Sequence, residues 1–438
     1  MGAIVSRKKF RCSFSKMLSW DFNSNYLNAI NHCSWPVTPL SKISSMRFEM
    51  ATKNEIETGQ VLMLDRISFD EGKVFAGNRE ETKMSQYKAY RGDIVVSKIN
   101  ARKGAIGIVE SDLPVGTTIH FRVLIPDSTQ IDTKFLQLAL RSPFCRNQFE
   151  IQTGGQGKGE ISEERLKSIN VPIPLLSVQQ KIVAHWEAIK LKSLLADQSL
   201  VDLVAELDSH LVKRTKAFDQ VTQSKVFLAN YARTQQWDVK AGRAAAFISA
   251  NPDFVRLGDY TEECSETVCP WEDSEKEWPV YGVNNKVGVF LSGKQKGKDF
   301  NAPYKKIKKD WFFHNPTRAN VGSLGIVADV PVDAITSPEY QVWKLSGGFL
   351  PDFMALLIRT NYFLSLVAFN RVGGVKQRMY YSNLAEIRLP MIEDGIQEHY
   401  AKRREEILED ILVANQMIVQ RKKEIEQMIL GMRPMGVS

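Results

Sequence analysis

The stretch VPIPLLSVQQKIV, residues 171–183, marks the point where an extended segment turns into a helix. Its two prolines disfavour helical backbone, so the chain is expected to stay extended until the serine that follows them. A weaker copy, LPMIEDGIQ, occurs at residues 389–397, with Ile392 in the place of Pro174. A junction that occurs twice, about half a chain apart, predicts a duplicated fold.

Other short matches recur in the same order, each displaced by 217–219 residues in a chain of 438. They are Trp20-Asp21-Phe22 with Trp237-Asp238-Val239, Leu40 with Leu257, Asp93–Val96 with Asp310–Phe313, Gly104 with Gly322, Gly154-Gly155 with Gly373-Gly374, and Gln179 with Gln397. A single match would carry no weight, but an ordered series at a constant displacement indicates two equivalent halves. The period is a whole domain, which excludes a solenoid.

Each half has the same internal plan. Short β-like runs such as Gly92–Val96 and Trp311–Phe313 come first, and a Gly-Gly loop, a short polar helix and an extended stretch follow. A long helix closes each half. The sequence therefore predicts an α+β protein with two pseudo-symmetric domains of mixed short strands and helices. The predicted domains are residues 1–176 and 226–393, and the predicted long helices are residues 177–225 and 394–432.

Both long helices are predicted to begin at a capping box, Ser177-x-x-Gln180 in the first and Asp394-x-x-Gln397 in the second. Apolar residues then recur at spacings of four and three, which is typical of coiled-coil seams. The residues expected to pair are Ile182, Trp186, Ile189, Leu200, Leu203 and Leu207 with Ile407, Ile411, Ile418 and Ile425.

Polar residues interrupt the two seams, at Ser193 in the first helix and at Arg404 and Arg421 in the second. One alternative is that each helix packs only on its own domain. We favour an antiparallel coiled coil, because each helix supplies the apolar partner that the other needs.

The bulk composition, with 43% hydrophobic and 25% charged residues, is that of an ordinary soluble globular protein. A net charge of +8 fits a polyanionic partner, although many other proteins carry as much. Five scattered cysteines (Cys12, Cys33, Cys145, Cys264 and Cys269) favour a reducing, cytoplasmic compartment over a disulfide framework. They lack zinc-site spacing, so no metal is expected, and no apolar run is long enough to predict a membrane span.

Three stretches together resemble the DNA-specificity (S) subunit of bacterial type I restriction–modification systems. They are residues 171–175 followed by 179–183, the strand-like Arg91–Lys98, and Gly104–Val109. The resemblance covers nearly the whole chain, because the plan is duplicated. It implies two target-recognition domains that each read one half of a split, asymmetric DNA site. It also implies that the long helices set the distance between the half-sites; about 40 helical residues give a rod of roughly 60 Å, against about 34 Å for one turn of DNA.

The resemblance implies partners as well: double-stranded DNA, two methyltransferase (modification) subunits and, for restriction, motor–nuclease subunits. This chain would bind no cofactor, and S-adenosylmethionine would be held by the methyltransferase. Enzyme motifs are not found: Asn315-Pro316-Thr317-Arg318 lacks the features of an adenine methyltransferase, and Gly154–Gly159 lacks those of a P-loop. The open alternatives are a specificity subunit of a methylation-only or other phage-defence complex, and a coiled-coil adaptor that binds only protein.

Two pairs of loops are the candidates for contacting DNA, because phosphates require cations and base edges require planar donors and acceptors. The first pair lies between predicted strands, and its alternative interpretation is a solvated hairpin. Its candidates are Lys98, Asn100, Arg102 and Lys103 in the first half and His314, Arg318 and Asn320 in the second.

The second pair consists of the Gly-Gly loops, whose glycines permit close approach of the backbone to a phosphate. The alternative is a flexible turn before a helix. The candidates are Gln156 and Lys158 in the first loop and Lys376, Gln377 and Arg378 in the second. A lysine-rich stretch from Lys294 to Lys309 is a further candidate for contact with phosphates independent of sequence.

Overall fold

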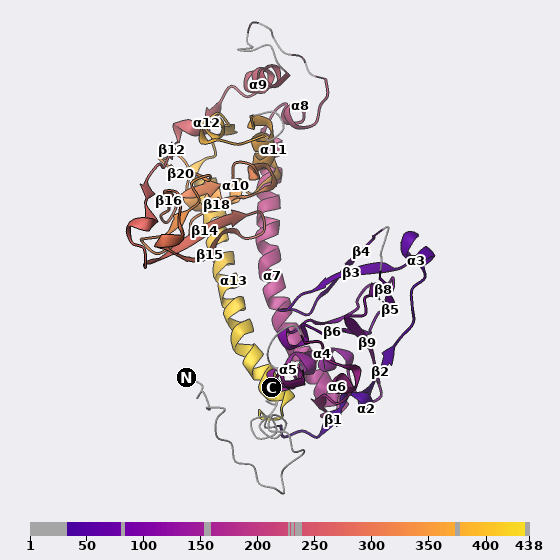
Figure 1. The fold of residues 1–438 in the computed structure, drawn as a ribbon. Coiled ribbons are helices and arrows are strands. Elements are labelled where there is room, and N and C mark those ends of the chain that lie inside the picture. Colours follow the sequence, from indigo (N-terminus) through magenta and orange to yellow (C-terminus); the bar gives the residue numbers. More distant parts are fainter. Residues whose placement is uncertain are drawn as a thin grey trace. The chain divides into compact units, whose positions relative to one another are not determined.

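The computed structural model describes residues 33–79, 84–152, 159–226, 228, 232, 239–372 and 377–433 (Figure 1). The chain divides into two compact units, which are described separately. Unit 1 contains Met1–Ser193 and Asn415–Ser438, and unit 2 contains Leu194–Ala414. The two long helices are therefore each divided between the units and do not form bodies of their own.

Unit 1 is built from two small sheets and a strand pair. An antiparallel sheet has the strand order β2-β9-β6-β7, and a mixed sheet has the order β4-β3-β8-β5, in which β3 and β8 are parallel. The strands are β1 (Val37–Pro39), β2 (Ser44–Arg47), β3 (Leu62–Ile67), β4 (Val74–Gly77), β5 (Tyr87–Ala89), β6 (Ile94–Ser97), β7 (Ile106–Ile108), β8 (Val115–Thr117), β9 (Phe121–Pro126) and β10 (Asn170–Pro172). The short helices are α2 (Leu40–Ile43), α3 (Lys53–Glu57), α4 (Thr133–Arg141), α5 (Pro143–Gln152) and α6 (Glu163–Lys167).

Unit 2 repeats this topology. The sheet β12-β20-β17-β18 corresponds to β2-β9-β6-β7, and the sheet β13-β16-β19-β14-β15 contains the same parallel pair, β14 with β19. The strands are β11 (Phe254–Arg256), β12 (Thr261–Glu263), β13 (Thr267–Val268), β14 (Glu277–Asn284), β15 (Gly288–Lys296), β16 (Tyr304–Lys306), β17 (Phe312–His314), β18 (Leu324–Ile326), β19 (Ile335–Thr336), β20 (Gln341–Leu345) and β21 (Arg388–Pro390). The short helices are α8 (Phe218–Thr222), α9 (Val239–Ala250), α10 (Pro351–Leu357), α11 (Asn361–Asn370) and α12 (Tyr381–Ala385). The predicted α+β fold with two equivalent halves is confirmed.

The strands form where the sequence matches them best. All four residues of β6 are buried, and three of them are the β-branched run Ile94-Val95-Val96, which suits a strand covered on both faces. A short 3-10 helix links β6 to β7 and ends at Gly104, whose φ of 96° favours glycine. The corresponding turn in unit 2 ends at Gly322, with φ of 89°. The repeat of this glycine therefore has a conformational reason.

The long helices are α7 (Leu176–Arg214) and α13 (Asp394–Ile429), so the first ends before the predicted Lys225. The predicted capping boxes are wrong. The Leu175 carbonyl accepts from the N–H groups of Val178 and Gln179, which places the turn into α7 before the predicted cap residue. At the start of α13 the Glu393 carbonyl likewise accepts from the N–H groups of Ile396 and Gln397.

A buried glutamine joins each long helix to its domain. Gln179 donates from Nε2 to the Pro174 and Gln130 carbonyls at 2.8 and 3.2 Å, and its Oε1 accepts the N–H of Asp132 at 2.8 Å. All of these partners belong to the backbone. The repeated glutamine in the sequence is therefore a structural joint between α7, the extended stretch before it and the start of α4.

Gln397 makes the same three contacts in unit 2. It donates to the Ile392 and Gly348 carbonyls at 2.9 and 3.0 Å, and it accepts the N–H of Leu350 at 2.9 Å. Because the joint uses the carbonyl of residue 392, the exchange of proline for isoleucine there leaves it intact. The weaker copy of the sequence motif thus forms an equally complete junction.

The predicted pairing of the long helices occurs in each unit. In unit 1, Ile182 and Trp186 of α7 share an apolar core with Ile425 of α13. In unit 2, Arg403 of α13 reaches Glu206 of α7 with N–O distances of 2.9 Å. The pairing is antiparallel, because the early part of α7 meets the late part of α13 and the late part of α7 meets the early part of α13.

In unit 2 the seam also packs on the domain itself. Leu203 and Leu207 are buried in a core that includes Phe353 and Tyr362, and Leu200 and Ile407 pack against it. The two interpretations of the helices, pairing with each other and packing on a domain, are therefore both correct at these positions.

The middle of the seam is looser than predicted. Ile189, Ile411 and Ile418 are only partly buried and belong to neither core. The interrupting Arg404 turns to Asp352 of α10, and its pKa is lowered by burial. Arg404 thus finds its partner outside the helix pair, whereas the other interrupting arginine, Arg421, pairs with Glu424 on α13 itself.

Candidate nucleic-acid interface

The loop after β6 positions four of the sequence-predicted residues of unit 1. Lys98 is largely buried, and its ammonium lies 2.7 Å from Glu160 Oε2, so a carboxylate of its own domain offsets its charge. Asn100 and Arg102 are partly buried, and Lys103 is exposed. Contact of Lys98 with DNA stays a prediction, and the carboxylate that pairs with it could not be inferred from the local sequence.

His314 is a wrong prediction. It is the last residue of β17 and fully buried, with Nε2 2.9 Å from the Met379 carbonyl. Burial lowers the pKa of His314 to about 4, so the imidazole is neutral and inaccessible to DNA. Arg318 is exposed, and Asn320 is partly buried.

Within each unit, a described residue just beyond the Gly-Gly loop is hydrogen-bonded to the loop after β6 or β17. The N–H of Ile161 donates to the Lys98 carbonyl at 3.0 Å, and the N–H of Met379 donates to the Pro316 carbonyl at 2.8 Å. Lys98 corresponds to Pro316 and Ile161 corresponds to Met379 in the two halves of the chain. The described residues 97–102 and 159–162 thus form a surface that we call the loop surface of unit 1, and the equivalent residues of unit 2 form a surface of the same design.

In unit 2 an arginine strengthens this connection. Arg371 Nη2 donates to the carbonyls of Thr317 and Gln377, at 3.2 and 2.6 Å. Each carbonyl is followed by an exposed arginine, Arg318 in one loop and Arg378 in the other. We call the surface formed by residues 315–320 and 377–380 the loop surface of unit 2. Gln377 itself is partly buried.

Three of the predicted contact residues, Gln156, Lys158 and Lys376, lie outside the described residues. Sequence reasoning also missed residues that belong to the loop surfaces. In unit 1, Glu160 forms an ion pair with Lys98 through Oε2, and its Oε1 lies 2.5 Å from His120 Nδ1. The Lys98 hydrogen bond holds the pKa of Glu160 below its usual range. No sequence motif connects Glu160, Lys98 and His120, because they come together only when the sheet folds.

The lysine-rich stretch of unit 2 is partly neutralised by its own domain. Lys296 and Lys298 pair with Glu275, and Lys308 and Lys309 pair with Glu266 and Asp329. Such exposed pairs are weak and still leave the lysines accessible. They nevertheless reduce the net positive field that the sequence suggested for this stretch.

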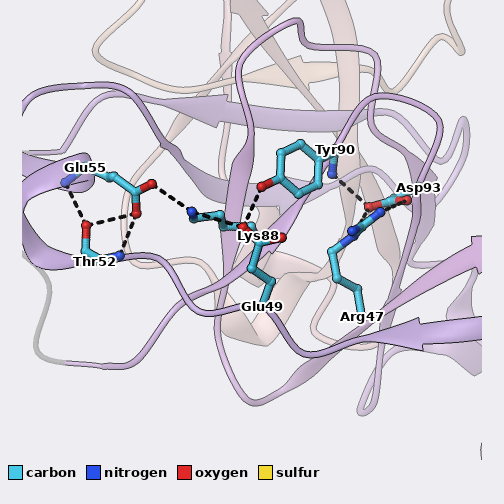
Figure 2. A network of polar contacts seen from close by, with 7 residues as sticks. All are labelled: Arg47, Glu49, Thr52, Glu55, Lys88, Tyr90 and Asp93. Carbon is cyan, nitrogen blue, oxygen red and sulfur yellow. Dashed lines mark hydrogen bonds and ion pairs between the residues drawn. The ribbon is translucent and has the colours of Figure 1, made fainter.

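A polar network in unit 1 accounts for other charged residues near the sheets (Figure 2). Lys88 of β5 donates to Glu49 and Glu55, at 3.2 and 2.7 Å. Arg47 at the end of β2 donates to Asp93, which also accepts the N–H of Tyr90 at 2.8 Å. These cations have carboxylate partners within their own domain, which marks the network as part of the scaffold.

The described residues give no sign of a metal centre or of a disulfide-linked framework. No group of three or more His, Cys, Asp or Glu residues among them could hold a metal ion. Cys33, Cys145, Cys264 and Cys269 are free thiols, and burial raises the pKa of Cys264 to about 11. In the same part of the chain, no single helix is long and apolar enough to cross a membrane; α10 and α11 would suffice only together, and they are bent by 75°.

Comparison with known proteins points to one family. Residues 52–193 match the family described as "Type I restriction modification DNA specificity domain". No curated protein matches the chain.

Three solved structures are similar over most of their length. The type I restriction-modification S subunit from M. genitalium is 14% identical, with a TM-score of 0.44, over 93% of this chain and 98% of that one. The HsdS subunit from Thermoanaerobacter tengcongensis is 13% identical, with a TM-score of 0.31, over 91% and 95%. A chain from a structural study of type I R-M complex assembly and conformational transition is 13% identical, with a TM-score of 0.42, over 91% and 96%.

Proposed function

We propose that this chain is a member of the type I restriction modification DNA specificity family, whose model matches residues 52–193, and that it reads the two halves of a split, asymmetric DNA site, one with each unit. The observation that carries this proposal is the pair of loop surfaces. Equivalent backbone hydrogen bonds, Ile161 to Lys98 and Met379 to Pro316, build both surfaces on the same scaffold. The exposed side chains on the two scaffolds differ, as expected for readers of two different half-sites.

We infer that the chain itself performs no chemistry and that S-adenosylmethionine is bound by a separate methyltransferase subunit. Support comes from the family match and from the absence of a recognisable methyltransferase or P-loop motif in the sequence. Two methyltransferase subunits would dock on one chain, because the duplicated plan offers two equivalent sites. Motor–nuclease subunits would join where the system cleaves DNA.

The long helices offer a surface for this docking. In unit 2, Leu194 and Val201 of α7 are 64% and 59% exposed. They are seven residues apart and therefore share one face of the helix. On α13, Leu412 is 57% exposed. Apolar side chains on the outer face of a helix are a common mark of a protein partner, and we assign the methyltransferase subunit to this face.

The decisive experiment maps methylated bases across a genome with and without this gene. Loss of methylation at a bipartite motif is the expected result, and it would identify the target sequence at the same time. The purified chain should transfer no methyl group on its own. Unchanged genomic methylation, or methyl transfer by the chain alone, would overturn the proposal.

A further inference from the structure

The two loop surfaces differ in charge at one equivalent position. Ile161 and Met379 make equivalent hydrogen bonds, so the residues just before them, Glu160 and Arg378, occupy corresponding places. Unit 1 therefore has a carboxylate where unit 2 has a guanidinium. Because the backbone scaffold is shared, this difference bears on what each unit can recognise.

In unit 1 the carboxylate is already engaged. Glu160 Oε2 lies 2.7 Å from Lys98 Nζ, and Oε1 lies 2.5 Å from His120 Nδ1. A carboxylate recognises cytosine by accepting a hydrogen bond from its amino group. Both oxygens of Glu160 are held by side chains of its own domain, so the position is part of the scaffold in unit 1.

In unit 2 the guanidinium is exposed and its backbone is fixed. Arg378 exchanges two backbone hydrogen bonds with Val372, at 2.9 and 2.7 Å. Its side chain donates from Nη1 to the Tyr380 hydroxyl at 3.4 Å, and no carboxylate among the described residues forms an ion pair with it. Glu339 attracts the guanidinium without forming an ion pair with it, so donors of the planar fork remain for a base.

We propose that Arg378 reads a guanine in the half-site of unit 2, and this inference rests on the proposed function. A guanidinium on a fixed backbone can donate two parallel hydrogen bonds to the O6 and N7 atoms of guanine, a pairing that the other bases do not offer. Arg371 donates to the carbonyls of both Thr317 and Gln377, and these bonds keep Arg378, the residue after Gln377, at the loop surface. Unit 1 reads its half-site without a counterpart of this contact.

The test selects bound DNA from a pool of duplexes with randomised positions, using the full chain in complex with its methyltransferase subunit. Four proteins are compared: wild type, Arg378→Ala, Arg378→Lys and the control Lys402→Ala, which removes an exposed charge from α13. Thermal unfolding of each chain verifies that the exposed substitutions leave the fold intact.

We expect wild type and Lys402→Ala to select the same bipartite site with a guanine in one half. Both Arg378 variants should lose the preference at that single position by about 5- to 150-fold and keep the other half-site unchanged. Lysine retains the charge and lacks the planar fork, so loss in both variants marks base reading.

Two results overturn the inference alone. The first is an unchanged preference for guanine in Arg378→Ala. The second is that Arg378→Lys keeps the full preference while Arg378→Ala binds all sequences equally more weakly. The second pattern would identify a phosphate contact. If the wild-type complex selects no sequence, the proposed function fails as well, so the two failures are distinguishable.

Discussion

The N–H of Asp132 donates to Gln179 Oε1 at 2.8 Å, at a glutamine that is completely buried. Replacement by alanine removes three hydrogen bonds and leaves backbone groups without partners. We expect Gln179→Ala to lower the free energy of unfolding of unit 1 by about 2 kcal/mol or more. Denaturant unfolding monitored by circular dichroism would measure this change.

The neighbouring Gln180 provides a matched control, because its side chain is exposed. Gln180→Ala should change the free energy of unfolding by less than about 0.5 kcal/mol. Equal effects of the two substitutions would show that the joint does not contribute to stability.

His314 gives unit 2 a pH dependence. Its pKa of about 4 in the folded protein lies below the ordinary 6.5, so the unfolded chain binds the extra proton first. The stabilisation is complete above about pH 6.5 and is lost as the pH falls to about 4, by up to about 3 kcal/mol. His314→Gln should flatten unfolding curves measured between these pH values.

The exposed His399 of α13 serves as the comparison, and His399→Gln should leave the slope in place. A slope that persists unchanged in His314→Gln would mean that other groups cause the acid sensitivity of unit 2.

Arg318 follows Thr317 in the chain, and its exposed side chain belongs to the loop surface of unit 2, as does that of Arg378. We predict a phosphate contact for it. Arg318→Ala should weaken DNA binding about equally on all sequences and reduce the salt dependence, log K against log salt, by about one unit. Fluorescence anisotropy at several salt concentrations measures both, and a change confined to one base position would argue against this role.

The outer face of α7 should carry the methyltransferase. The double variant Leu194→Glu with Val201→Glu places two charges in that apolar contact and should sharply reduce co-purification of the methyltransferase subunit. Val332→Glu, at a fully exposed apolar residue elsewhere in unit 2, should have no such effect. Normal complex formation by the double variant would exclude this face.

The spacing between half-sites should depend on helix length. Removal of four residues from the middle of both α7 and α13 shortens each by about 6 Å, close to two base-pair steps of about 3.4 Å. The recognised gap should contract accordingly in a methylation map. A variant with the same four residues changed to alanine should retain the original gap, and an unchanged gap after deletion would contradict the role of the helices as a ruler.

The scaffold was more predictable than the loop surfaces, for a physical reason. Gln179, Gly104 and β6 have requirements that belong to their own position: a buried joint, a positive φ and a strand covered on both faces. The environments of Lys98 and His314 could not be predicted, because they depend on distant residues, Glu160 and Met379. Local composition identifies a polar residue, but only tertiary contacts decide whether its side chain is accessible.

The joint at Gln179 and Gln397 has a consequence for how such a protein can change over time. Both glutamines bind only carbonyl and amide groups, so the identities of the neighbouring side chains are free to drift. The exchange of Pro174 for Ile392 between the two copies is an instance of that freedom. A recognition domain could be replaced wholesale by a divergent one and still fasten to the same helix. New target sequences would then arise by exchange of readers on a frame that remains constant.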